Sequence, residues 1–312
     1  MKKDFLSILD LDAETLAVCL NLSAELKRDR GLGRRAPSAD ALGGRHVALL
    51  FEKPSLRTRS TFEIAIRELG GEVVSPAQDA TLGGRESIAD VARNLERWVA
   101  AVVIRTFEQA KLEAFAAAAA RLHVVNALTN EEHPCQALAD CLTLREHWNT
   151  LPGRTLAFVG DGNNVAASLA QACLMLGISV HVASPAGYDL PPGVVAAAAA
   201  VARGGATVAS FRDPHEAVRE ADAVYTDVWT SMGHEAENAA RRAAFAPYRV
   251  DADLMASARP GAIFMHCLPA HRGDEVTDEV IDGPASVVFD QAENRLHTQK
   301  ALLQMLVAPE SV

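Results

Sequence analysis

The sequence lacks the features that bring proteins to nucleic acids or membranes. Its 312 residues carry a formal net charge of −10, with no run rich in lysine or arginine. This balance argues against nucleic acid or an anionic membrane as the main partner. No segment approaches the ~18–20 apolar residues of a membrane span, and acidic residues closely follow the two lysines of MKKDFLSILDLD. We therefore expect neither a secretory signal nor a membrane anchor.

Cysteine is scarce and scattered. The cysteines form no CxxC pair and are odd in number, which argues against a disulfide framework or a zinc knuckle. A reduced, cytoplasmic setting fits this usage best. His266 and Cys267 are adjacent, but neighbouring residues on a strand point to opposite faces, so we expect no metal shared between them. The five cysteines are Cys19, Cys135, Cys141, Cys173 and Cys267.

Aromatic residues make up only 5% of the chain, yet hydrophobic residues together reach 49%, enough for a large core. Short apolar runs alternate with longer helical patterns such as 86–98, 108–121 and 164–177. Most of the runs are continuously apolar, which is typical of parallel strands covered on both faces. The expected strands are 46–51, 71–75, 100–105, 123–128, 155–160, 179–184, 206–210, 221–227, 262–269 and 286–290.

This alternation predicts an α/β fold of two doubly wound parallel-sheet domains of similar size. The boundary is expected within 144–154, where a long helix ends and Pro152-Gly153 precedes a new strand. We place the first domain at 1–148 and the second at 149–291. Ligands bind such sheets at the carboxyl ends of the strands, so the loops there should carry the function.

The segment FEKPSLRTRSTFE (51–63) places cations where a helix begins. Apolar residues recur at helical spacing from Phe62 to Leu69, so Arg57 and Arg59 fall in or near the first turn. The macrodipole is already positive there and disfavours cations, unless an anion binds. Free N–H groups, hydroxyls and a guanidinium together suit phosphate oxygens.

Two further strand ends carry residues of the same kind. Arg105 ends the third expected strand, while His133 and Gln136 follow the fourth, around the start of a helix. Three strand ends, those of the first, third and fourth expected strands, thus deliver Arg or His, which favours convergence on one phosphate-like ligand.

The turn in TLAFVGDGNNVAAS (155–168) resembles a dinucleotide-binding turn only weakly. Gly160 and Gly162 are present, but Val165 takes the place of the third glycine. The next expected strand, 179–184, has no Asp or Glu near its end to hold a ribose hydroxyl. A nicotinamide cofactor is a poor fit, and the asparagines of the turn can instead present amides to a carboxylate or an amino group.

The segment DVWTSMG (227–233) offers groups for an amino-acid head group. Asp227 can pair with a cationic amine, whereas Ser231 and the backbone of Met232 can meet a carboxylate. The second half of the chain therefore predicts an amino-acid site rather than a nucleotide site.

Four motifs in this order and spacing, FEKPSLRTRSTFE, HPCQALAD, DVWTSMG and HCLP, resemble those of the ornithine carbamoyltransferases. The resemblance extends from Phe51 to Leu303. It implies transfer of the carbamoyl group of carbamoyl phosphate to the δ-amine of L-ornithine, giving L-citrulline and phosphate, in arginine biosynthesis rather than breakdown. It also implies an active site in the cleft between the domains, no cofactor or metal, a C-terminal helix (292–312) that completes the first domain, and a homotrimer or a multiple of trimers.

The resemblance also assigns roles to single residues. The catalytic residues it implies are Arg57, Arg105, His133 and Cys267. The carbamoyl phosphate contacts it implies are Ser55, Leu56, Arg57, Thr58, Arg105, His133, Gln136, Cys267, Leu268 and Arg295. The ornithine contacts it implies are Asn164, Asp227, Ser231 and Met232. The sequence differs from the family pattern in TLGGRES, where Thr81 takes the place of a glutamine that the family often has.

Two other interpretations stay open at this stage. A carbamoyltransferase could act on a related amine, putrescine or an N-acylated ornithine, although Asp227 favours a free α-amino group. A nucleotide-binding dehydrogenase or regulatory module belongs to another class, and the incomplete glycine pattern argues against it.

Overall fold

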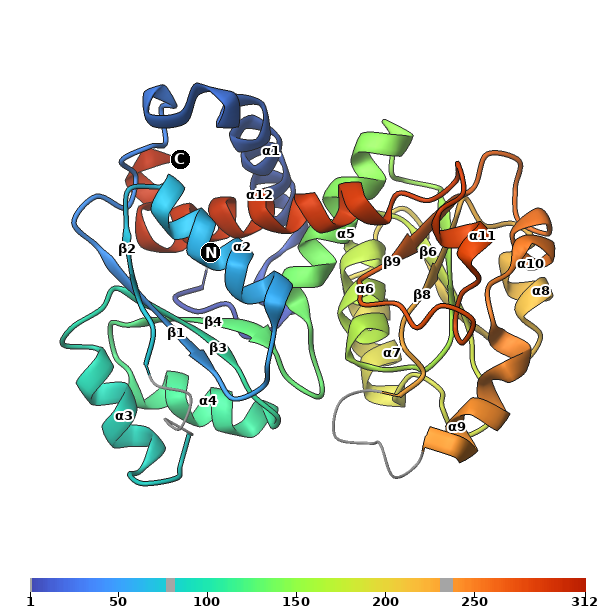
Figure 1. The fold of residues 1–312 in the computed structure, drawn as a ribbon, viewed down its shortest axis with the longest axis horizontal. Helices are drawn as coiled ribbons and strands as arrows, with labels where there is room; N and C mark the ends of the chain where they lie inside the picture. The colour runs from blue at the N-terminus through green and yellow to red at the C-terminus, as the bar shows by residue number, and fades with distance from the viewer. Residues whose placement is uncertain (1, 77–81, 231–237) are drawn as a thin grey trace. The chain divides into compact units, whose positions relative to one another are not determined.

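The computed structural model describes residues 2–76, 82–230 and 238–312 (Figure 1). The chain divides into two compact units, Met1–Leu142 with Glu293–Val312 and Thr143–Ala292. Within the described residues, one unit has a sheet of four parallel strands and the other a sheet of five. This confirms the predicted α/β fold, whereas the domain division at 148/149 stays a prediction.

The sheet of the first unit has the strand order β2-β1-β3-β4. β1 pairs with β3 so that Phe51 lies opposite Arg105, and these two strands end at the same level. β2 lies on the other side of β1, so the strand order reverses direction between β1 and β3. The strands are β1 (His46–Phe51), β2 (Glu72–Val74), β3 (Ala101–Arg105) and β4 (His123–Leu128).

Helices cover both faces of this sheet. Figure 1 shows α1, α2 and α12 on one face and α3 and α4 on the other. Strand side chains such as Val102 and Ile104 pack with Phe115 of α4 in a buried apolar cluster. The helical segments are η1 (Ile8–Asp10), α1 (Ala13–Asp29), η2 (Arg30–Arg35), α2 (Leu56–Glu68), α3 (Ile88–Leu95), α4 (Gln109–Ala118), α5 (Pro134–Trp148), α12 (Val288–Val307) and η5 (Pro309–Ser311).

The sheet of the second unit has the strand order β7-β6-β5-β8-β9. Its order reverses direction between β5 and β8. Thr226 of β8 lies opposite His266 of β9, so the loops after these two strands begin side by side. The strands are β5 (Thr155–Val159), β6 (Ser179–Ala183), β7 (Val208–Phe211), β8 (Ala223–Thr226) and β9 (Ile263–His266).

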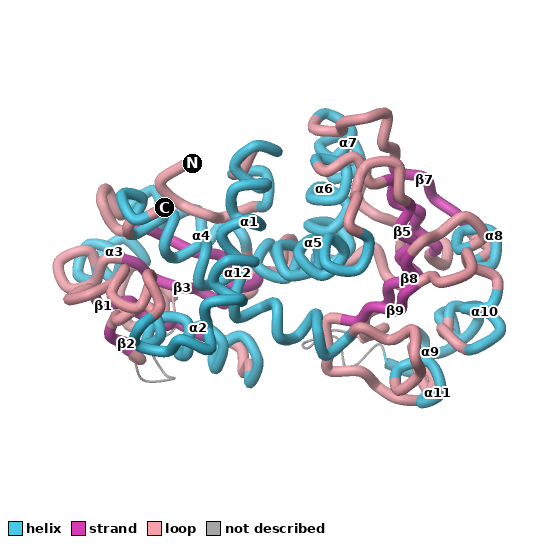
Figure 2. Tube along the Cα trace, turned by 90° about the horizontal axis from the view of Figure 1, so that it is seen from above, coloured by secondary structure: helices cyan, strands magenta, loops and turns pink. Residues whose placement is uncertain are grey.

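Alternate residues of β5 enter two different cores. Leu156 and Phe158 pack in one buried cluster, whereas Ala157 and Val159 pack in another. Figure 2 shows α6 and α7 on one side of this sheet and α8, α9, α10 and α11 on the other. Burial on both faces explains why the strands read as continuous apolar runs. These helical segments are α6 (Asn164–Met175), α7 (Pro192–Ala200), α8 (Pro214–Val218), α9 (Asn238–Phe245), η4 (Ala246–Tyr248), α10 (Ala252–Ala256) and α11 (Asp278–Ile281).

The strand expected at 286–290 is wrong. Only an isolated bridge forms there, between Ser286 and Phe264 of β9, and α12 begins at Val288. A short apolar run does not by itself distinguish a strand from the start of a buried helix. Polar residues also occupy the buried face of α12, among them Gln291 and Arg295, so the helix shows no clear apolar stripe in the sequence.

None of the helices in the described part of the chain is both long and apolar enough to cross a bilayer.

Candidate active site

The carboxyl ends of β1 and β3 flank the point where the first sheet reverses its strand order. In open α/β sheets the connections leave in opposite directions at such a point and open a crevice for ligands. The loop after β1 leads into α2 at Ser55, and Arg105 ends β3 with 8% of its surface exposed. The fold thus brings two of the predicted phosphate-binding segments to one place.

The start of α2 is built without a side-chain cap. Ser55 is the N-cap residue but its hydroxyl makes no capping hydrogen bond, and the first turn contains no acidic residue. Arg57 is half-buried. Its guanidinium makes no hydrogen bond or ion pair with any residue that the structure describes. Free N–H groups and a nearby cation both favour an anion, so the start of α2 has the chemistry expected of a phosphate site.

Arg295 links two of the segments that the sequence singled out. Its guanidinium lies buried and donates to Gln136 Oε1 at 2.5 Å and to Thr58 Oγ1 at 2.9 Å. Gln136 in turn donates to Asp140 Oδ1 at 2.8 Å. The first turns of α2 and α5 are therefore held by one side chain from α12.

His133 lies directly before α5 and is buried. Burial lowers the pKa of its imidazole well below the usual 6.5, and the charges of Arg295 and Arg105 lower it further. The ring is therefore neutral at physiological pH. A neutral imidazole beside two guanidinium groups can donate one hydrogen bond without adding a third positive charge.

His133 should also make folding stability depend on pH. Its pKa is near 6.5 in the unfolded chain and well below that in the folded protein. Its contribution is thus complete above about pH 6.5 and is lost as pH falls below it. We expect His133→Asn to reduce the acid loss of unfolding free energy by about 1.4 kcal/mol at about pH 5.5, in urea titrations at several pH values.

A matched control is His46→Asn at the exposed start of β1. It removes an imidazole without changing the buried surroundings of His133. His297, whose pKa is also lowered by burial, stays in both variants, so part of the wild-type dependence remains. An identical pH dependence in wild type and His133→Asn would contradict a neutral buried His133.

The sequence motifs did not single out Lys53. Its side chain is buried, donates to Asn130 Oδ1 at 2.7 Å and lies 4.1 Å from the centre of the Phe107 ring. Burial lowers the pKa of its ammonium group, and the charge of Arg105 lowers it further. Its position between the end of β1 and the start of α2 is the feature by which the sequence could have identified Lys53.

Arg59, the second cation near the start of α2, contacts an aromatic ring. Its guanidinium lies 5.5 Å from the centre of the Phe51 ring, in a cation–π contact. The Glu52 carboxylate accepts hydrogen bonds from the Leu82 amide, at 2.7 Å, and from the Thr106 hydroxyl.

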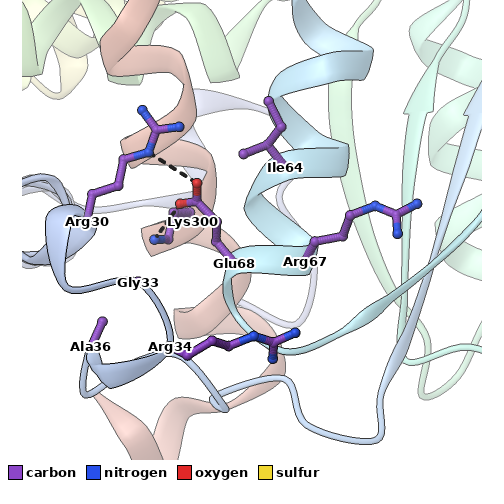
Figure 3. Close-up of a pocket in the computed structure, with 8 residues that line it drawn as sticks. All are labelled: Arg30, Gly33, Arg34, Ala36, Ile64, Arg67, Glu68 and Lys300. Carbon is purple, nitrogen blue, oxygen red and sulfur yellow. Dashed lines mark hydrogen bonds and ion pairs between the residues drawn. The ribbon is translucent and has the colours of Figure 1, made fainter.

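A cavity of about 300 Å³ lies at the other end of α2 (Figure 3). Glu68 lies between Arg30 and Lys300, with N–O distances of 3.1 and 3.0 Å (Figure 3). Cations at the C-terminal end of a helix are favoured by its dipole. Together with the Thr58–Arg295 bond, the Glu68–Lys300 pair ties both ends of α2 to α12, and we assign the cavity residues this structural role.

Asp227 is the centre of the site in the second unit. It follows β8, beside the point where the sheet reverses its strand order, and is 7% exposed. Its carboxylate accepts from Asn163 Nδ2 and from the Val228 amide, both at 2.8 Å, and from Cys267 Sγ at 3.0 Å. A buried carboxylate whose donors are all neutral is a suitable partner for a cationic amine.

Asn163, to which the family resemblance gave no role, is the residue that orients Asp227. Its Oδ1 caps α6 by accepting from the amides of Val165 and Ala166, which leaves its Nδ2 for Asp227. Asparagine before a helical pattern is a standard N-cap signal. Asn164, the predicted ornithine contact, is the first residue of α6 and is half-buried.

The glycine turn after β5 packs closely against the segment that contains Tyr188 and Leu190. The Gly162 amide donates to the carbonyl of Tyr188 at 2.8 Å. A Cβ added at Gly162 would lie 2.3 Å from the Leu190 amide nitrogen, so glycine serves close packing there. The local packing therefore accounts for Gly162 without a bound nucleotide.

The expectation that His266 and Cys267 point apart is wrong. One ligand atom from each of Asp227, His266 and Cys267 lies within 4.8 Å of the others. β9 ends at His266, so strand alternation does not extend to Cys267. The His266 ring is nevertheless committed elsewhere, because its Nδ1 accepts from the Leu268 amide at 2.8 Å and its Nε2 lies 3.2 Å from Glu275 Oε1.

Cys267 should be the reactive thiol of the folded protein. It is half-buried, whereas the other four cysteines are buried, and burial raises the pKa of the Cys135 thiol to about 12. We expect iodoacetamide to modify Cys267 alone, as read by peptide mapping, and Cys267→Ser to abolish the modification. Labelling of a buried cysteine at a comparable rate under native conditions would contradict this arrangement.

The structure gives the positions of further predicted site residues, whose roles stay predictions. Leu56 is 78% exposed at the first position of α2, and Leu268 is half-buried after Cys267. Thr81, Ser231 and Met232 lie outside the described residues.

The chain matches two family models over most of its length. Residues 3–146 match the carbamoyl-P binding domain of aspartate/ornithine carbamoyltransferase, and residues 152–306 match its Asp/Orn binding domain. A curated ornithine carbamoyltransferase of Acidothermus cellulolyticus is 54% identical over 309 residues, which cover 98% of this chain and 97% of the relative.

Solved structures agree with these matches. An ornithine carbamoyltransferase from Pyrococcus furiosus is 46% identical with a TM-score of 0.93, and the match covers 98% of this chain and 97% of that one. One from Thermus thermophilus is 44% identical with a TM-score of 0.88, covering 98% and 99%. The chain belongs to the aspartate/ornithine carbamoyltransferase family.

Proposed function

We propose that this protein is an ornithine carbamoyltransferase, which transfers the carbamoyl group of carbamoyl phosphate to the δ-amine of L-ornithine. The observation that carries the choice of acceptor is Asp227, a buried carboxylate held by neutral donors at the end of β8. The relatives at about half identity across the chain, all named ornithine carbamoyltransferase, support the same choice.

In this proposal the first unit binds carbamoyl phosphate. The start of α2 and the guanidinium groups of Arg57 and Arg105 hold the phosphate and stabilise the charge that develops as it leaves. Ser55, Leu56 and Thr58 complete the phosphate loop. Arg295 and Gln136 shape the carbamoyl end, where Arg295 already contacts Gln136 and Thr58.

His133 polarises the carbonyl of carbamoyl phosphate. Its lowered pKa makes it a neutral hydrogen-bond donor, which matches an oxygen that becomes partly negative during attack. Arg105 supplies the positive charge near that oxygen. Removing the imidazole should therefore slow the chemical step more than it weakens ground-state binding.

The second unit orients the amino acid. Asp227 holds the α-ammonium group and Asn164 the carboxylate side, with Ser231 and Met232 as further contacts, so that the δ-nitrogen meets the carbonyl carbon. The δ-amine has an ordinary pKa of about 10.4 and must arrive unprotonated. Its lone pair forms the C–N bond, the bond from carbon to the phosphate oxygen breaks, and a phosphate oxygen takes the proton.

Putrescine and N-acylated ornithine remain the alternative acceptors. Putrescine keeps an ammonium group that Asp227 can hold, but it has no carboxylate for Asn164, Ser231 and Met232 to meet. An acyl group on ornithine would remove the charge that Asp227 pairs with. The proposed carboxylate contacts and Asp227 together therefore support free ornithine.

The test is citrulline formation from carbamoyl phosphate with one acceptor at a time. Ornithine should give the highest kcat/KM, with acetylornithine, putrescine and aspartate at least about 10²-fold lower, as expected when a site's buried polar groups lose their partners. Preference for any of the other three acceptors would overturn the proposal.

The physiological setting is also a proposal. We assign the protein to arginine biosynthesis, to the cytoplasm and to a homotrimer or a multiple of trimers. A Campylobacter jejuni relative that is 35% identical is described as anabolic, and the reduced, scattered cysteines suit the cytoplasm. Rescue of an arginine auxotroph tests the direction, and light scattering should give a multiple of three times 33.2 kDa.

A further inference from the structure

We propose that His266 and Glu275 are a positioning pair that fixes the backbone of Cys267 and Leu268 for carbamoyl transfer. The inference rests on the proposed function, because Cys267 and Leu268 are the segment expected to meet the substrates. Neither His266 nor Glu275 is among the residues that the motifs themselves mark as substrate contacts.

His266 is completely buried at the end of β9. Its amide donates to Gln291 Oε1 at 3.0 Å, which fixes the backbone before the loop. The amide of Leu268 donates to His266 Nδ1 at 2.8 Å. A backbone N–H can only donate, so Nδ1 carries no proton and the ring proton lies on Nε2.

Glu275 accepts the hydrogen bond from the N–H group at His266 Nε2. Its side chain is completely buried, and its Oε1 lies 3.2 Å from His266 Nε2. The same oxygen accepts from the His271 amide at 2.5 Å. Burying a carboxylate and an imidazole costs desolvation energy that an apolar pair of similar size avoids. Packing alone does not explain the pair, whereas control of the ring's tautomer and orientation does.

The backbone beside the His266–Glu275 pair has an unfavourable conformation that other contacts must stabilise. Leu268 has a φ of +56°, a left-handed conformation that residues with a Cβ adopt at an energetic cost. Such a conformation persists when its surroundings determine it. The bond from the Leu268 amide to His266 Nδ1 is the described interaction that does so.

The held segment also reaches the amino-acid site. Cys267, between the ring and Leu268, brings its Sγ to within 3.0 Å of Asp227 Oδ1. A chain of contacts thus runs from Glu275 through His266 to the residues expected at both substrates. A change in the His266 ring should therefore displace the loop without removing any group that touches substrate.

Two substitutions at one position separate positioning from packing. In His266→Asn the amide oxygen can replace Nδ1 as acceptor for Leu268, whereas in His266→Gln the amide replaces Nε2 and the acceptor for Leu268 is lost. We expect His266→Asn to keep kcat within about fivefold of wild type. In His266→Gln, kcat should fall by about 10²-fold, which is the effect of misplacing a reacting group by about 1 Å. Both should lower the melting temperature to a similar degree.

Two substitutions of Glu275 provide a second matched pair of variants. Glu275→Gln keeps an oxygen that accepts from His266 Nε2 and from the His271 amide, so kcat should stay within about threefold. Glu275→Leu removes the acceptor and should lower kcat about as much as His266→Gln. Equal losses of kcat in His266→Asn and His266→Gln, tracking their losses of stability, would reduce the pair to a packing role.

A readout that needs no turnover keeps this inference separate from the proposed function. The rate of Cys267 alkylation reports the loop geometry directly, and it should change in His266→Gln and stay near wild type in His266→Asn. If the wild-type protein formed no citrulline, the proposed function would fail while the alkylation rates still decided the positioning role. Equal alkylation rates in wild type and both variants would overturn it.

Discussion

Replacing Arg57 with alanine is expected to lower kcat by about 10²–10³-fold, the usual effect of removing one preorganised group that stabilises developing charge. Phosphate affinity should fall as well, because the start of α2 then offers N–H groups without the guanidinium. Arg57 is half-buried and forms no ion pair within the described residues, so the fold should survive. Citrulline formation and isothermal titration with phosphate measure the two effects.

Arg67→Ala is the matched control for Arg57→Ala. It removes the same charge from the same helix, at an exposed position one residue before its last. Its kcat and phosphate affinity should stay near wild type, which separates the local site from the general charge of α2. Near wild-type turnover in Arg57→Ala would remove the proposed role of the helix start.

Replacing Asp227 with asparagine is expected to lower kcat/KM for ornithine by about 10²-fold or more. Loss of one member of a desolvated charge pair costs about 2–5 kcal/mol, and Asp227 is buried among neutral donors. An asparagine Nδ2 would also face one of the donors that now point at the carboxylate. Binding of carbamoyl phosphate should change much less, because its proposed phosphate contacts, Arg57 and Arg105 among them, lie in the first unit.

Asp222→Asn provides the comparison for Asp227→Asn. Asp222 is a buried carboxylate of the same sheet that accepts from the Thr155 amide at 2.9 Å and from Arg154 at 2.8 Å. Its loss should lower stability and leave KM for ornithine unchanged. If Asp227→Asn changed only stability, as expected for Asp222→Asn, the amine-binding role of Asp227 would be wrong.

The cations at the start of α2 show what the local sequence could predict. The helix, the place of Arg57 in its first turn and its buried apolar residues from Phe62 to Leu69 are all as expected. Helical periodicity and the macrodipole act over a few residues, so both are readable from the chain. The conflict between Arg57 and the dipole therefore follows from the order of the residues alone.

The order of the strands is not readable in the same way. Nothing in the local sequence places β3 beside β1 or β8 beside β5, yet these neighbours create the two points where the strand order reverses. Strand order depends on contacts between segments far apart in the chain. For the same reason Arg295, in the last helix, could be linked to Thr58 and Gln136 only by the fold.

The sequence by itself determined the α/β class, the positions of most strands, the cation in the first turn of α2 and, through its motifs, the family. The tertiary structure alone decided that Asn163 orients Asp227, that His266 turns to Leu268 and Glu275, and that 286–290 begins a helix. The physical reason is the distance along the chain over which each interaction acts. Propensity, capping and charge at a helix end are local, whereas the partner of a buried polar group is fixed by which distant segments pack against it.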